Sequence, residues 1–215
     1  MKEVFNDYKN DSIKLDKYQI IGIFCLLIVV AGITGWIYEF IFYYFNGGMK
    51  KFYMQGGNFL PWINIYATGS IMILLLTYKL KKSPLKVFLV SFLSTGILEY
   101  FSGLIIYKLF NGLRLWDYNV GILNFGNISG FVCLRSVLIF GLGGLAIVYY
   151  IVPFLIYLSK KIDKKVFLIG SIILCSIFLF DEFYNLLFAR IVNTPRASAV
   201  YKEIGFEYVK FNKEK

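Results

Sequence analysis

The residue of this sequence with the clearest capacity for chemistry is Glu99, a carboxylate inside the apolar run from Leu85 to Phe110. A charge near the centre of a bilayer costs roughly 2.5–3.5 kcal/mol on insertion scales, so it normally faces the bundle interior and has a partner or a role. Residues three and four positions apart share one face of a helix. Glu99 is therefore expected on a stripe with four small residues of the same run: Ser91, Thr95, Ser102 and Gly103.

Other polar residues gather after Glu99 and near the ends of two further apolar runs. The loop after Phe110 contains Trp116-Asp117-Tyr118-Asn119, and Arg135 lies near the start of the next run. Two other runs carry acidic residues beside aromatic ones, at Glu39-Phe40 and at Asp181-Glu182. We predict one polar cluster, for substrate binding or for structure, made of Glu39, Glu99, Trp116, Asp117, Tyr118, Arg135, Asp181 and Glu182.

The residue types that the sequence lacks, or has only singly, limit the reactions that its side chains could catalyse. The sequence has no histidine, which excludes Ser-His-Asp and Cys-His catalysis and imidazole metal sites. Its three cysteines lie singly within apolar runs, which favours buried apolar residues over disulfides or metal ligands. We therefore predict no catalytic residue, no metal site and no cofactor.

Composition places the chain in a membrane. Of its 215 residues 58% are hydrophobic and 20% are aromatic, and long apolar stretches are typical of membrane spans. The net charge of +10 would suggest nucleic acid in a soluble protein. Here the basic residues flank the apolar runs, as membrane topology predicts, so we expect the lipid bilayer and not nucleic acid as the partner.

The apolar runs predict an all-α fold, a polytopic integral membrane bundle of about five transmembrane helices. A polar tail (1–19) would precede the bundle (20–189), and a polar, basic tail (190–215) would follow it. The expected spans are residues 20–45, 62–80, 85–110, 131–158 and 166–189, each near the ~20 residues that a bilayer requires.

Basic residues favour the cytoplasmic side, and they are concentrated in the N-terminal tail and in the linkers 79–86 and 159–165. This predicts a multi-pass cell-membrane protein with a cytoplasmic N-terminus, although the basic C-terminal tail then lies outside against the rule.

Spans one, three and five would run in the same direction. At 1.5 Å per residue, Glu99, Asp181 and Glu39 would lie ~20, ~24 and ~33 Å beyond the last basic residue before their spans. The predicted cluster would then line one cavity in the outer half of the membrane. The alternative is that Glu99 and Arg135 pair only to hold helices together.

Several motifs resemble a family of bacterial membrane proteins named as ABC-transporter type IV permeases, over residues 30–190. The family's Gly-Trp-x-x-Glu resembles Gly35 to Glu39, and three further family elements resemble Glu99-Tyr100, Trp116 to Asn119 and Asn127 to Leu134. A Gly- and Pro-rich family block resembles Gln55 to Tyr66. Two family arginines are replaced here, by Gln55 and Phe131, and Arg135 lies one turn after the second.

The resemblance implies a permease-like subunit of a transport system. The sequence has no Gly-x-x-x-x-Gly-Lys-Ser/Thr loop, so energy would come from a separate ATPase subunit. Five spans would need a homo-oligomer or another subunit to form a path. The alternative function is an intramembrane lipid-binding protein or a lipid-modifying enzyme that uses carboxylates; a structural or regulatory membrane partner is a third. The sequence favours transport over catalysis and leaves the substrate and the direction of transport open.

Overall fold

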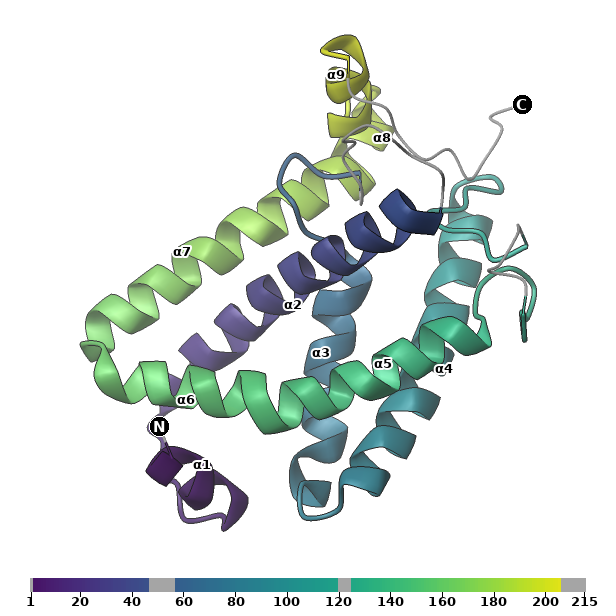
Figure 1. Cartoon of the computed structure of the whole chain (residues 1–215). Coiled ribbons are helices and arrows are strands. Elements are labelled where there is room, and N and C mark those ends of the chain that lie inside the picture. The colour runs from purple at the N-terminus through teal and green to yellow at the C-terminus, as the bar shows by residue number, and fades with distance from the viewer. Residues whose placement is uncertain (1, 47–56, 120–124, 206–215) are drawn as a thin grey trace. The chain divides into compact units, whose positions relative to one another are not determined.

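The computed structural model describes residues 2–46, 57–119 and 125–205, and within them every regular element is helical (Figure 1). Four helices are long and apolar enough to cross a membrane: Lys17–Phe45, Pro84–Leu109, Leu134–Lys161 and Lys164–Val192. The predicted second span is shorter, because α3 (Asn64–Thr77) has 14 residues and continues only into the 3-10 turn η1 (Tyr78–Leu80). The predicted all-α membrane bundle is confirmed.

The remaining elements extend or flank these spans. The helix α1 (Lys2–Lys9) precedes α2 (Lys17–Asn46), and α4 (Pro84–Leu109) follows η1. The third long span consists of α5 (Leu134–Ala146), the π-helical segment η3 (Ile147–Ile151) and α6 (Val152–Lys161). The last span is α7 (Lys164–Phe183), which continues through the π-helical η4 (Tyr184–Phe188) into α8 (Ala189–Val192) and precedes α9 (Ala197–Glu203).

Short polar signals fix where the spans begin. The Asp16 carboxylate accepts hydrogen bonds from the backbone N–H groups of Tyr18 and Gln19, at 3.0 and 2.9 Å, and so caps α2. Asp163 caps α7 in the same way. Pro84 opens α4, where its missing N–H removes no helical hydrogen bond.

The chain forms two compact units. Unit 1 combines residues 2–13 with Gly69–Phe154, and unit 2 combines Lys14–Thr68 with the described residues after Phe154. Glu99 lies in unit 1, whereas Glu39, Asp181 and Glu182 lie in unit 2.

In unit 1, α4 and α5 pack closely and run antiparallel. A Cβ added at Gly141 would lie 2.7 Å from Phe88 near the start of α4, and one at Gly96 would lie 2.9 Å from Val137 near the start of α5. Small residues permit this close approach of two helix backbones.

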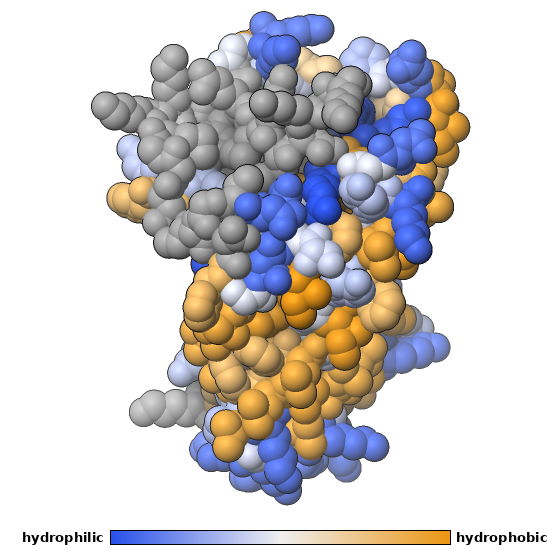
Figure 2. All heavy atoms as spheres, turned by 90° about the vertical axis from the view of Figure 1, so that its right-hand side faces the viewer, coloured by the Kyte–Doolittle hydropathy of each residue, from blue (hydrophilic) through white to orange (hydrophobic). Residues whose placement is uncertain are grey.

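The two faces of α4 invert the pattern of a soluble helix. Its buried stripe carries the polar and small residues Ser91, Thr95, Glu99 and Gly103, as the sequence predicts except for a half-buried Ser102. Its exposed stripe is aliphatic or aromatic at every fourth position: Leu85, Leu89, Leu93, Ile97, Phe101, Ile105 and Leu109. Figure 2 shows a band of hydrophobic side chains on the face viewed there, bounded at its lower end by hydrophilic residues. Such an exposed stripe suits contact with lipid.

In unit 2, α2 and α7 run in the same direction, as expected for predicted spans one and five (Figure 1). Lys164, at the start of α7, forms an ion pair with Asp16 before α2. Farther along, a Cβ at Gly32 would lie 2.9 Å from Phe178. The buried cluster between these helices includes Val29, Trp62 and Phe178.

The N-terminal helix is attached to the turn between η1 and α4 by Lys81. The Lys81 side chain is 2% exposed, and its ammonium lies 4.6 and 3.9 Å from the ring centres of Tyr8 and Tyr78. It also donates a hydrogen bond to Asp11, which lowers the pKa of that carboxyl below its usual range. Burial raises the pKa of the Tyr8 phenol.

Candidate functional site

The carboxylate of Glu99 is buried in unit 1, with 2% of the residue exposed. Its Oε1 accepts a hydrogen bond from the Tyr118 hydroxyl at 2.8 Å, and its Oε2 accepts one from the Ser136 hydroxyl at 2.6 Å. Tyr118 comes from the loop after α4 and Ser136 from the first turn of α5. Glu99 therefore joins three consecutive segments of the chain at one point.

Ser136 is held by the start of its own helix. Its Oγ lies 2.8 Å from the carbonyl oxygen of Cys133 and accepts a hydrogen bond from the Cys133 N–H at 3.3 Å. The Cys133 side chain accepts in return from the Ser136 backbone, so the two residues form a capping box. The beginning of α5 thus fixes the hydroxyl that faces Glu99.

Arg135 supplies the positive charge of this centre. It attracts the Glu99 carboxylate electrostatically, and its guanidinium lies 5.8 Å from the ring centre of Tyr118. Three residues of the predicted eight-residue cluster, Glu99, Tyr118 and Arg135, therefore lie near one another, and we call them, together with Ser136, the Glu99 centre. The direct hydrogen bonds to Glu99 come from the two hydroxyls, and Ser136 is the partner that sequence reasoning missed.

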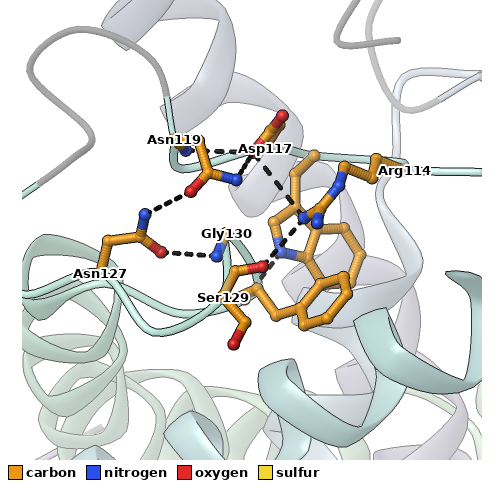
Figure 3. Close-up of polar contacts among 8 residues, drawn as sticks. Arg114, Asp117, Asn119, Asn127, Ser129 and Gly130 are labelled. Atoms are coloured by element: carbon orange, nitrogen blue, oxygen red, sulfur yellow. Dashed lines mark hydrogen bonds and ion pairs between the residues drawn. The ribbon is translucent and has the colours of Figure 1, made fainter.

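The loop that carries Tyr118 is held closed by a chain of polar contacts (Figure 3). Asp117 Oδ1 accepts from the backbone and side-chain amides of Asn119, at 3.0 and 2.6 Å, and lies 3.8 Å from Arg114. Asn127 donates to Asn119 at 2.8 Å and accepts from the N–H of Gly130 at 2.6 Å. Gly130 has φ +76°, and a Cβ there would lie 2.7 Å from Asp117 Oδ1. The absence of a side chain at Gly130 lets this part of the loop lie close to Asp117.

Trp116 and Phe131 add further contacts between the two sides of this loop. The Trp116 indole donates to the carbonyl oxygen of Phe131 at 2.8 Å, and the backbone N–H of Tyr118 donates to the carbonyl of Gly130 at 3.0 Å. The guanidinium of Arg114 lies 4.5 Å from the centre of the Phe131 ring. At position 131, where the resemblance placed a family arginine, this chain therefore has a phenylalanine whose ring lies against Arg114. Arg135 lies at the Glu99 centre. Gln55, the other replaced position, lies outside the described residues.

Asp181 in unit 2 organises the turn that leads into α3. Its Oδ1 accepts from the N–H of Phe59 and its Oδ2 from the N–H of Leu60, at 3.0 and 2.9 Å. The indole of Trp62 donates to Oδ2 at 3.0 Å, and the amide of Asn185 donates to Oδ1 at 2.7 Å. These four donors satisfy a carboxylate that is 5% exposed, so Asp181 serves as a structural anchor.

Its neighbour Glu182 and the more distant Glu39 have different partners. Glu182 is 8% exposed and accepts a hydrogen bond from Asn58 at 2.7 Å. Glu39 is half-buried on α2 and accepts from the Tyr66 hydroxyl at 3.2 Å. Asn58 was missed because a single amide in a glycine-rich loop carries no periodic signal.

The predicted polar residues make their contacts within their own units. Glu99, Tyr118 and Arg135 meet in unit 1, with Trp116 and Asp117 in the adjoining loop, whereas Asp181 and Glu182 meet in unit 2 and Glu39 binds Tyr66. A single cavity lined by all of them stays a prediction. Among the described residues, no group of three or more His, Cys, Asp or Glu side chains is placed to hold a metal ion.

A family model described as "Putative ABC-transporter type IV" matches residues 26–186, which include the Glu99 centre, its loop and both carboxylates of α7. The chain belongs to this family. No curated protein and no solved structure matches the chain. Membership of the ABC-transporter type IV family, together with four apolar helices of spanning length, makes this a multi-pass membrane protein related to transport.

Proposed function

We propose that the chain is the permease-like subunit of a bacterial ABC-type transport system, and that the Glu99 centre is its substrate-handling site in the outer half of the membrane. The observation that supports this most directly is the buried Glu99 carboxylate, held by hydroxyls from the adjoining loop and from the next span. An ionisable residue inside a membrane span is costly to bury, and such residues are found along substrate and ion pathways. A loop that contacts the carboxylate directly could couple opening of the site to substrate entry.

The partner in this proposal is a separate ATPase subunit, because the sequence contains no phosphate-binding Gly-x-x-x-x-Gly-Lys-Ser/Thr loop. The described residues provide four long spans and the shorter α3, so a second copy of the chain or another membrane subunit would complete the path. The apolar stripe of α4 is exposed and could contact either lipid or such a subunit.

The experiment is purification of the tagged protein from its native membrane in mild detergent, followed by mass spectrometry and an ATPase assay of the recovered complex in liposomes. We expect an ATPase to co-purify with the wild-type chain and with Glu99→Gln, and Glu99→Gln to reduce ATP turnover at least tenfold. Glu203→Gln, which changes an exposed carboxylate on α9, is the matched control. Recovery without any ATPase, or unchanged turnover in Glu99→Gln, would contradict the proposal.

The alternative is an intramembrane lipid-binding protein or a lipid-modifying enzyme that uses carboxylates. It draws on the aromatic residues Trp116 and Tyr118, which lie in the loop beside the buried carboxylate. Belts of Trp and Tyr sit at headgroup level in membrane proteins. A lipid retained in stoichiometric amount without an ATPase in the same purification would favour this function over transport.

A further inference from the structure

Ser136 stands between two hydrogen-bond acceptors. Its Oγ is 2.6 Å from Glu99 Oε2 and 2.8 Å from the carbonyl oxygen of Cys133. A hydroxyl has one proton and two lone pairs, so Ser136 can donate to only one of these oxygens at a time. The other carboxylate oxygen, Oε1, has its own donor in Tyr118 at 2.8 Å.

This arrangement satisfies both protonation states of Glu99 without moving a heavy atom. When Glu99 is ionised, Ser136 donates to Oε2, Tyr118 donates to Oε1, and the positive charge of Arg135 favours this form. When Glu99 is protonated on Oε2, the new O–H donates to Ser136 Oγ. Ser136 then turns its own proton to the carbonyl oxygen of Cys133. A buried polar group without a partner costs about 1–3 kcal/mol, and in both states the two Glu99 oxygens and the Ser136 hydroxyl keep a partner.

We propose that Glu99 takes up and releases one proton during the transport cycle, and that Ser136 is the residue whose hydroxyl rotates to accommodate it. This inference rests on the proposed transport function and names the ion that the site handles. The balanced step is the addition of H⁺ from a hydronium ion to the carboxylate, which gives the neutral acid and one water molecule. The reverse step returns the proton to water.

The surroundings of Glu99 suit a switch between charged and neutral forms. Among the described residues, the titratable and charged side chains that face it are Tyr118 from the loop and Arg135 from α5. Small or apolar groups lie at three other contacts of this part of α4, with Phe131 against Gly103, Val137 against Gly96, and Gly69 near Thr95. The direct donors are neutral hydroxyls, which can adjust to either form, whereas a lysine bonded to the carboxylate would hold it ionised.

The test is infrared difference spectroscopy of the full chain in lipid nanodiscs as the pH is lowered in steps. We expect a carboxylic C=O band that appears as pH falls, shifts in heavy water, is absent from Glu99→Gln and persists in Glu203→Gln. Ser136→Ala removes the acceptor of the acid O–H, so the band should move to higher frequency, whereas Ser136→Thr, which keeps the hydroxyl, should leave its position unchanged.

Three results would overturn the inference. One is a band that is identical in wild type and Glu99→Gln; another is a band that Ser136→Ala leaves in place. The third is a band that responds to sodium ions at constant pH more than to pH itself. The same preparations are tested for the co-purifying ATPase. An ATPase without the proton band removes this inference and leaves the proposed function. A proton band without an ATPase contradicts the proposed function and, with it, the transport cycle named here, and leaves Glu99 as a group that binds a proton.

Discussion

At the scale of single residues, the Glu99 carboxylate depends on donors that come from different segments of the chain. Tyr118 reaches it from the loop, and Ser136 reaches it from α5. Loss of either hydrogen bond would therefore leave a Glu99 oxygen without that donor and would also detach the loop or α5 from the carboxylate. Asp181 shows the contrasting case of a carboxylate whose four donors belong to one turn and to its own helix.

Tyr118→Phe tests the loop contact directly. The substitution keeps the ring and removes the donor to Glu99 Oε1, so a buried carboxylate oxygen loses its partner. We expect the free energy of unfolding in detergent to fall by about 1–3 kcal/mol.

Tyr107→Phe is the matched control for this prediction, because the half-exposed Tyr107 contacts Arg114 and Phe131 through its ring. It should stay within about 0.5 kcal/mol of wild type. Equal losses in the two variants would show that the hydroxyl of Tyr118 contributes nothing specific.

At the scale of elements, the sequence predicted the helices and the polar stripe of α4, because apolar run length and the helical repeat are local properties. It also placed Glu99, Tyr118 and Arg135 in one predicted cluster of eight residues, since a charge in an apolar helix calls for polar partners. It did not predict Ser136 as a partner of Glu99, or the turn at residues 58–62 as the partner of Asp181. Serine is common in membrane helices, and a bond between Asp181 and the N–H groups of Phe59 and Leu60 joins residues 122 and 121 positions apart. Long-range backbone contacts of this kind have no sequence signature.

The packing of α5 on α4 is tested by two adjacent glycines. A Cβ at Gly144 would lie 2.5 Å from Ser91 Cβ, whereas one at Gly143 would meet nothing within 4 Å. Gly144→Ala should therefore force the two helices apart and lower stability by about 1–3 kcal/mol, as overpacking generally does. Gly143→Ala should be neutral or stabilising by up to about 1 kcal/mol, since alanine favours helix. Thermal unfolding in one detergent compares them, and an equal effect of both would refute the close contact.

The attachment of α1 is expected to weaken in acid. The hydrogen bond from Lys81 lowers the pKa of Asp11 in the folded state, so its contribution is present above the ordinary carboxyl pKa. That contribution is lost as pH falls through the lowered value. Because half of the Asp11 side chain is exposed, we expect a small effect. Hydrogen exchange of residues 2–9, corrected for intrinsic rates, should increase in acid.

Asp11→Asn should reproduce the acid behaviour of α1 at neutral pH, because asparagine cannot form the ion pair with Lys81. Glu3→Gln removes an exposed charge from the same helix and should leave exchange unchanged. Slow exchange of α1 in Asp11→Asn would show that the Tyr8 and Tyr78 rings hold Lys81 without the carboxylate.

At the scale of the whole molecule, the orientation in the membrane decides on which side the Glu99 centre opens. Basic residues favour the cytoplasmic side, which predicts that the Lys79–Lys86 linker lies inside and the loop after α4 lies outside. Single cysteines at Lys82 and Leu115 test this, because both positions are exposed and each lies at a different end of α4.

An impermeant thiol reagent should label Leu115→Cys in intact cells and Lys82→Cys only after lysis. The wild-type chain is the control, since its free cysteines lie within the long helices or, like Cys133, are buried. The reverse pattern would place the Glu99 centre near the cytoplasm, and labelling of both sites in intact cells would remove α4 as a membrane span.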